Sequence, residues 1–276
     1  MAVAQPRVAA VGDNCIDVYT DLAQSAVGGN ALNVAVHLRR LGSESEYLGA
    51  VGADDDGRRV LRALEGQGVR HQRVQIEAGQ TAISELALDA RGERIVVSER
   101  FGVCAGYAPE ADDIEYVRSF DHVHCANLTW FSAVAEALMA RSVSFSFDFA
   151  VTLSSTHFRG LEIAFLGSEV PPEDGRTAAL ARAAVSRGAR LAVVTCGPYG
   201  SLAFDGERIV TTAPASSKIV DTCGAGDSYI AAFIYSKLGG ATLRECMRAG
   251  AEAAAETCRH LAAWPQTLER LREVSA

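Results

Sequence analysis

The sequence of 276 residues predicts an α/β fold, in which helices cover both faces of a doubly wound, mostly parallel sheet with a small β lid. Three observations carry this prediction. From Asp121 onward, short apolar strands alternate with helical patterns, as in parallel sheets built from βαβ units. A glycine-rich turn at 221–227 opens an apolar helix. A hairpin near 82–98 does not fit the alternation, and it therefore predicts a lid or a dimer surface.

The first half of the chain is expected to alternate strands with helices. A helix over 28–41 is predicted because Val34, Leu38 and Leu41 share one face and Gly42 follows as a stop signal. The other expected elements are strands at 7–12 and 47–51, a helix at 58–64, and hairpin strands at 82–88 and 93–98 around a turn at 89–92.

The second half repeats this rhythm. Its expected elements are strands at 122–126, 143–149, 163–167 and 191–195, helices near 133–140 and 177–185, a hairpin of 201–204 with 208–212, and a helix at 229–238. A capping box at Thr242–Glu245 opens one further helix. No internal repeat or linker interrupts the pattern, so we expect a single domain over 1–276. In such sheets ligands bind beyond the carboxyl ends of the strands.

Composition narrows the function. The net charge is −8 and no basic run occurs, which argues against a nucleic-acid partner. Lys218 and Lys237 are the only lysines, and no Gly-Lys-Ser/Thr exists, so a Walker-type phosphate loop is excluded. Seven cysteines without a Cys-x-x-Cys pair indicate a reducing compartment. No apolar run approaches 18 residues, so we expect no membrane association and a cytoplasmic location.

The turn Asp221-Thr222-Cys223-Gly224-Ala225-Gly226-Asp227 predicts an anion site. Small residues let a ligand approach the backbone, and the first amides of the following helix lack partners within it. These donors and the helix dipole suit a phosphate. Asp227 lies at the edge of that site and would be repelled by a phosphate, which suggests a general base for an attacking hydroxyl. The alternative is a simple helix entry with Asp as its cap.

A second group of polar residues lies near the first strand. Asp13 and Asp17 follow it directly, and Asn30 and Asn33 come after Gly28-Gly29. Carboxylates and amides of this kind suit a polyhydroxylated ligand, because together they donate and accept hydrogen bonds. The alternative is local structure, with Asp13 and Asn14 forming a turn and Asn30 capping the next helix.

Together these motifs resemble the ribokinase-like (PfkB) carbohydrate kinases. Gly28-Gly29-Asn30-Ala31-Leu32-Asn33-Val34-Ala35 is similar to the first family signature, and 221–227 matches the second. The opening Gly12–Tyr19 segment and Trp264 look most like bacterial fructoselysine 6-kinases. The resemblance implies a lid with strands from about 14–27 and 81–101, often used for homodimers. It also implies Mg-ATP as the phosphoryl donor.

The resemblance also implies residue roles. Asp227 would be the catalytic base, and Gly224, Ala225 and Gly226 would form the anion hole for the transferred phosphoryl group. The residues implied for the sugar are Asp13, Asp17, Gly29, Asn30 and Asn33. The residues implied for the nucleotide are Thr195, Gly197, Gly200, Gly224 and Gly226.

The loop at 167–173 differs from the family pattern, and Arg100 needs separate consideration. The family's Asn-x-x-Glu motif, which organises magnesium, is replaced by Gly167-Ser168-Glu169-Val170-Pro171-Pro172-Glu173, so no metal ligand is assigned. Arg100 follows the second hairpin strand. In related sugar-acid kinases an arginine near this place contacts an acidic substrate, so Arg100 is a candidate partner for a substrate carboxylate. The alternative is a solvated surface arginine.

The expected function is ATP-dependent transfer of the γ-phosphoryl group to a primary hydroxyl, the 6-OH, of a ketose derivative such as fructoselysine. A kinase for fructose, a sugar acid or a nucleoside is the first alternative, and a non-catalytic sugar sensor on the same fold is the second. A thiol hydrolase built on Cys223 is a third, although the sequence shows no histidine partner for it. A monovalent cation near Asp221 is left open.

Overall fold

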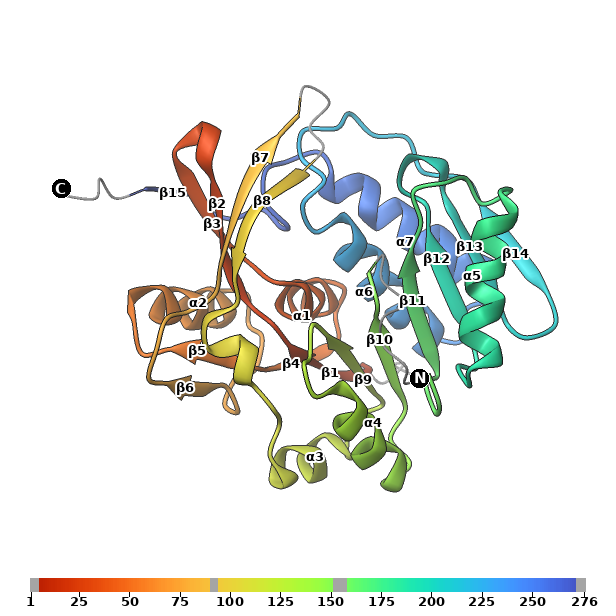
Figure 1. The fold of residues 1–276 in the computed structure, drawn as a ribbon, viewed down its shortest axis with the longest axis horizontal. Coiled ribbons are helices and arrows are strands. Elements are labelled where there is room, and N and C mark those ends of the chain that lie inside the picture. Colours follow the sequence, from red (N-terminus) through yellow and green to blue (C-terminus); the bar gives the residue numbers. More distant parts are fainter. Residues whose placement is uncertain (1–4, 90–93, 151–157, 272–276) are drawn as a thin grey trace.

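The computed structural model describes residues 5–89, 94–150 and 158–271 (Figure 1). Within them the main sheet has the strand order β14 (Ile209–Thr212), β13 (Ser201–Phe204), β12 (Ala192–Thr195), β11 (Ile163–Gly167), β10 (Phe145–Asp148), β9 (His122–Ala126), β1 (Arg7–Gly12), β4 (Glu44–Leu48). Within this sheet the six strands β4, β1, β9, β10, β11 and β12 are parallel, and β13 runs antiparallel to both of its neighbours. The predicted mostly parallel sheet is confirmed, and the carboxyl ends of its parallel strands meet at one edge.

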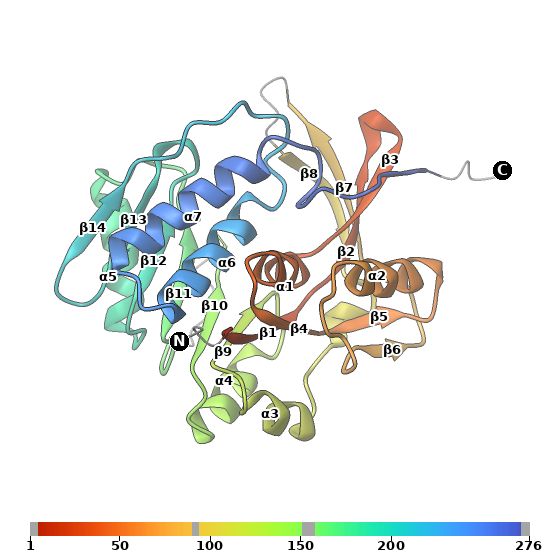
Figure 2. The same ribbon diagram turned by 180° about the vertical axis from the view of Figure 1, so that it is seen from behind.

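Helices cover both faces of this sheet (Figures 1 and 2). One face carries α1 (Asn30–Arg40), α6 (Ala225–Leu238) and α7 (Leu243–Thr257), and the other carries α3 (Ala111–Val117), α4 (Phe131–Ala140) and α5 (Gly175–Ser186). Strand β1 shows why two cores form. Val8 and Ala10 pack into the core with α1 and α6, whereas Ala9 and Val11 pack into the core with α4 and α5. Successive side chains of a strand point to opposite faces, so one apolar strand supplies both cores.

A second sheet forms the lid. Its strand order is β15 (Glu269–Arg270), β3 (Gln24–Gly28), β2 (Cys15–Tyr19), β7 (Ile83–Leu88), β8 (Arg94–Arg100). Figure 2 shows these strands rising beside α1, with α2 (Asp55–Gly66) against their lower part. Strands β2 and β3 lie close to the expected range 14–27, and β7 and β8 lie within 81–101, whereas β15 was not predicted. Residues 90–92 of the predicted turn and residue 93 of the predicted strand lie outside the described residues.

Two of the predicted elements differ from the structure for reasons that the packing shows. The strand expected at 47–51 is split between β4 and β5 (Ala50–Gly52), which pairs with β6 (Gln75–Glu77) in a separate small sheet. The chain turns at Gly49, where a Cβ would collide with the hydroxyl of Tyr47 and the carbonyl of Gly12. The helix expected from Gly28 begins at Asn30 instead, because Gly28 belongs to β3 and Gly29 has a φ of +110°.

The remaining elements are short 3-10 turns, η1 (Thr20–Leu22), η2 (Gly102–Gly106) and η3 (Gly197–Tyr199). The predicted capping box is confirmed at the start of α7, where Thr242 and Glu245 exchange hydrogen bonds. Across the described ranges, no helix combines the length and apolar character needed to span a bilayer.

Candidate active site

The glycine-rich turn leads directly into α6. Gly224 caps this helix with a left-handed φ of +73°, and a Cβ there would collide with Ala263. Gly226 lies in the first helical turn, and a Cβ there would meet no atom within 4 Å. The backbone of Gly226 therefore borders open space where the first amides of α6 emerge. This geometry suits a phosphate that approaches the positive end of the helix dipole.

Asp227 is held by a residue from the other signature segment. It lies on the first turn of α6 with a side chain only 7% exposed. Asn33 of α1 donates a hydrogen bond of 2.7 Å from Nδ2 to Oδ2 of Asp227. This bond between a buried amide and a carboxylate fixes the orientation of Asp227 beside the glycine-lined opening. The two signature segments thus meet in one site.

Asp13 is bound to backbone and amide donors from three positions. Its Oδ2 and Oδ1 accept hydrogen bonds of 3.1 and 3.0 Å from the amides of Asn30 and Ala31, and Asn127 donates one of 3.0 Å to Oδ2. Burial raises the pKa of Asp13, and these hydrogen bonds oppose that shift. The alternative in which Asn30 caps the helix is wrong: its side chain makes no capping bond, and Asp13 binds the first amides of α1 instead.

Asp17 lies on β2 between two thiols. The Cys15 thiol lies 3.2 Å from its Oδ1, and the Cys223 thiol lies 3.6 Å from its Oδ2. Burial raises the pKa of Cys15 well above its ordinary value, with a further contribution from the charge of Asp17. Cys223 is only 1% exposed, so its sulfur is shielded from an incoming substrate. The structure thus disfavours a thiol hydrolase and places Asp17 next to the glycine-rich turn.

Three of the predicted nucleotide residues, Thr195, Gly197 and Gly200, lie at and just after the end of β12. Gly200 has a φ of +103°, and a Cβ there would collide with the carbonyl of Thr212. Gly197 has a φ of +51°, and a Cβ there would meet nothing within 4 Å. Tyr229 of α6 donates a hydrogen bond of 2.9 Å to Ser201, the residue after Gly200. This bond ties the strand end to the helix that begins at the glycine-rich turn.

A cavity of about 370 Å³ opens near Asp13. It is lined by residues from the loop after β8 and from the ends of β9 and β10, among them Phe101, Asn127, Phe147, Asp148 and Phe149. Burial raises the pKa of Asp148 to about 6, and the charge of Asp13 adds to the shift. The sequence analysis did not assign Asn127 or Asp148 to the site, although they lie at the ends of the expected strands 122–126 and 143–149. Their position after short apolar strands was the available signal.

Arg100 does not face this site, contrary to the expectation that it binds substrate. It pairs with Ile83 across the lid, and Ile83 pairs with Ile16. Paired residues share one face of a sheet, so Arg100 lies on the face opposite to Asp17. Arg100 is exposed and forms an ion pair of 3.4 Å with Glu85. Its placement fits the alternative of a solvated surface arginine.

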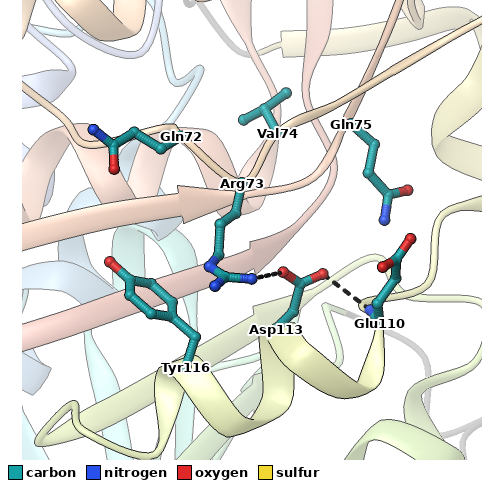
Figure 3. Close-up of a pocket in the computed structure, with 7 residues that line it drawn as sticks. All are labelled: Gln72, Arg73, Val74, Gln75, Glu110, Asp113 and Tyr116. Atoms are coloured by element: carbon teal, nitrogen blue, oxygen red, sulfur yellow. Dashed lines mark hydrogen bonds and ion pairs between the residues drawn. The ribbon is translucent and has the colours of Figure 1, made fainter.

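The loop that replaces the Asn-x-x-Glu motif is exposed at Glu169 and Glu173. Within residues 5–89, 94–150 and 158–271, no three His, Cys, Asp or Glu side chains converge as a metal site. A pocket of about 480 Å³ elsewhere contains Arg73, Asp113 and Tyr116 (Figure 3). Arg73 forms an ion pair of 2.8 Å with Asp113 and lies 4.3 Å above the Tyr116 ring. None of the predicted site residues lines this pocket.

The fold and the site together define a class. An α/β sheet with a β lid, and a buried carboxylate at a glycine-opened helix start, suit transfer of a phosphoryl group to an alcohol. The chain belongs to the pfkB family of carbohydrate kinases, whose sequence profile matches residues 13–144 and 164–267. It is therefore a sugar kinase, a phosphotransferase that acts on an alcohol group of a small molecule, and kinases of this family use ATP.

Relatives of known description support this assignment. The chain is 34% identical over 259 residues to a fructoselysine 6-kinase from Shigella flexneri, covering 93% of this chain and 99% of that protein. It is 31% identical over 262 residues to a fructosamine kinase from Bacillus subtilis, covering 91% and 90%. The structure of Arabidopsis thaliana ribokinase complexed with ribose and ATP shares the fold, with a TM-score of 0.79, 22% identity and coverage of 94% of each chain.

Proposed function

We propose that this kinase transfers the γ-phosphoryl group of ATP to the 6-OH of a ketose derivative of the fructosamine type, such as fructoselysine. The observation that carries the proposal is the hydrogen bond from Asn33 to Asp227 beside the open backbone at Gly226. It brings a buried, oriented carboxylate next to an anion-binding helix start. The substrate class is supported by the fructoselysine and fructosamine kinases among the relatives.

Asp227 acts as the general base in this proposal. It takes the proton of the sugar hydroxyl while the hydroxyl oxygen forms a bond to the γ-phosphorus and the bond to ADP breaks. General-base assistance contributes about 10²–10⁴-fold to a rate. Asn33 keeps the carboxylate aimed at the hydroxyl, because its amide binds one carboxylate oxygen. Asp17, Gly29, Asn30 and Asp13 surround the sugar position, with Asp13 also holding the start of α1.

The amides from Gly224 to Gly226 receive the charge that develops on the phosphoryl oxygens. One such donor is worth roughly 3–4 kcal/mol in the transition state. Thr195, Gly197 and Gly200 hold the nucleotide at the end of β12, and the open space beside Gly197 suits a close ligand. The lid excludes water, which would otherwise compete with the sugar for the phosphoryl group.

In this proposal Mg²⁺ would be bound mainly by the phosphates of ATP and less by protein side chains. Mg²⁺ commonly binds substrate phosphates, several waters and only one or two carboxylates, so the lack of a three-residue cluster among the described residues is compatible with it. Glu169 and Glu173 are the carboxylates of the loop after β11. When bound, Mg²⁺ supplies positive charge against the phosphates. The Asp221 carboxylate accepts hydrogen bonds from Tyr19, Ala262 and Cys223, and this proposal assigns it no monovalent cation.

A homodimer through the lid is part of the proposal, as is a location in the cytoplasm, where ATP is available. Strand β8 lies at the edge of the lid sheet. It exposes Ile95, Val96 and Val97, which are 51%, 43% and 58% exposed. An apolar edge strand of this kind favours pairing with another chain. Light scattering at micromolar concentration should give twice the 29.2 kDa chain mass, and a monomer would contradict this part.

The deciding experiment measures ADP release with Mg-ATP across fructoselysine, other fructose–amino acid adducts, fructose, a keto sugar acid and adenosine. We expect a strong preference for the adducts. Turnover of only a simple sugar, a sugar acid or a nucleoside would retain Asp227 as the base and overturn the substrate. Absence of turnover with every acceptor would favour the sensor alternative, which binding of the same compounds without ATP would then test.

A further inference from the structure

The cavity near Asp13 is lined mainly by apolar residues and contains one carboxylate, that of Asp148. Its lining includes Phe101, Phe147 and Phe149, together with the polar side chains of Asn127 and Asp148. Phe101 follows the last lid strand and is 47% exposed. The cavity therefore lies between the loop that follows lid strand β8 and the carboxyl ends of β9 and β10, with a volume of about 370 Å³. That volume is of the size that holds a small organic group.

Asp148 belongs to the same sheet edge as the sugar-site residues. It pairs with Ala126 on β9, and Ala126 pairs with Gly12 on β1. Asn127 and Asp13 are the next residues along these two strands, and they are joined by a hydrogen bond of 3.0 Å. The chain of contacts runs from Asp227 through α1 to Asp13 and Asn127. Asp148 thus lies at the same sheet edge as Asp13, with strand β9 between β10 and β1.

The charge of Asp148 has little compensation from the described protein. Its Oδ1 accepts a hydrogen bond of 2.9 Å from the Ala150 amide. Among residues 5–89, 94–150 and 158–271, no ion pair to Asp148 is found, and Arg100 lies on the other face of the lid. Desolvation raises its pKa to about 6, and the nearby charge of Asp13 adds to this shift. At neutral pH the cavity therefore presents negative charge, which favours a cation and repels an anion.

We infer that Asp148 is the counter-ion for the ammonium group of an amine-substituted ketose, and that the cavity beside it receives the substituent on that amine. This inference rests on the proposed function and names the residue that selects the substrate. A sugar joined to an amino acid through nitrogen carries a positive charge next to the ketose carbons. Its hydroxyl end reaches Asp227, its ammonium reaches Asp148, and its carbon chain lies against the phenylalanines. A sugar acid places a negative charge at the same point.

Asp148→Asn tests this role, because Asn keeps the shape and the oxygen that accepts from Ala150 while it removes the charge. Asp112→Asn is the matched control, since it removes the same charge from an exposed position in the first turn of α3. At pH 8 we expect kcat/KM for fructoselysine to fall about 10–100-fold in Asp148→Asn, mainly through KM. The value for fructose, which has no charge, should stay within about twofold, and the control should match the wild type for both.

The outcomes separate the inference from the proposed function. Wild-type turnover of fructoselysine with equal losses for both sugars in Asp148→Asn would overturn the ammonium role and leave the proposed function intact. If Asp148→Asn keeps the wild-type kcat/KM for fructoselysine, the ammonium role is likewise overturned and the proposed function stays intact. If the wild type phosphorylates fructose but none of the amine adducts, both the proposed substrate class and this inference are overturned. Thermal melts of both variants verify that the fold is retained.

Discussion

Tyr19 on the lid strand β2 donates a hydrogen bond of 2.6 Å to Oδ2 of Asp221, the first residue of the glycine-rich turn. The same carboxylate accepts from the amides of Ala262 and Cys223, at 2.9 and 2.8 Å. Asp221 is fully buried and Tyr19 is 1% exposed, so water does not compete for these bonds. The lid is thereby connected to the turn proposed as the anion site, through a tyrosine that the sequence analysis did not assign to the site.

The first prediction concerns this connection. Tyr19→Phe should lower sugar phosphorylation about 10-fold, because the lid strand loses its bond to the glycine-rich turn. Loss of one buried hydrogen bond should also cost about 1–2 kcal/mol of unfolding free energy. ADP and sugar phosphate are measured separately, and we expect more ADP than sugar phosphate as water enters the site. A variant that loses stability but keeps a one-to-one ratio would show that Tyr19 acts on folding alone.

The second prediction compares two glycines of the same turn. Gly224→Ala should destabilise the protein, because its φ of +73° and the contact with Ala263 both oppose a side chain. Gly226→Ala should leave the melting temperature unchanged or raise it, since Ala is favoured over Gly in a helix by up to about 1 kcal/mol. Its methyl group would nevertheless project into the space proposed for phosphate. We expect kcat/KM for ATP to fall at least 10-fold in Gly226→Ala, and full activity would contradict the anion site.

The third prediction concerns the pH dependence of stability at Asp148. The folded protein raises its pKa to about 6, above the ordinary value near 4, so the folded state binds more protons between these values. The cost of the buried charge is absent below about pH 4 and complete above the folded pKa of about 6. Asp148→Asn should therefore stabilise the protein at pH 8 by at most roughly 2–3 kcal/mol, and by nothing near pH 3.5. Melting curves at both values measure this, and equal shifts would contradict it.

Local patterns in the sequence predicted much of the sheet. The strands at Arg7–Gly12, His122–Ala126, Ile163–Gly167 and Ser201–Phe204 have the predicted bounds. Each is a short apolar run with a clear boundary, and such runs are favoured as buried strands by their own residues. The break at Gly49 was missed because it depends on Tyr47 and Gly12, which approach only in the folded chain. The two-residue strand β15 depends on pairing with β3 and has no local signal.

In the candidate site, too, local motifs were predictable and contacts between distant segments were not. The two signature segments were recognisable, but the bond between Asn33 and Asp227 joins residues far apart in the chain and required the packing of α1 on α6. Arg100 was a candidate for the substrate because an arginine near this place contacts an acidic substrate in the sugar-acid kinases that the chain resembles, and a solvated surface arginine was the alternative. Which face it occupies depends on the register of β8 with β7, and a shift of one residue would reverse it. Register across the lid was not readable from the sequence.

The last prediction tests the base itself. Asp227→Asn should reduce turnover about 10²–10⁴-fold, because the amide cannot take the proton of the sugar hydroxyl. Nucleotide affinity, measured by calorimetry with Mg-ATP, should stay within a few-fold, since the amides at the start of α6 remain in place. Asn33→Ala is the partner variant: it retains the carboxylate but removes the 2.7 Å bond that orients it, so its turnover should fall between the wild type and Asp227→Asn. If Asp227→Asn instead loses nucleotide binding while each bound complex turns over at the wild-type rate, Asp227 holds the ligand and another group accepts the proton.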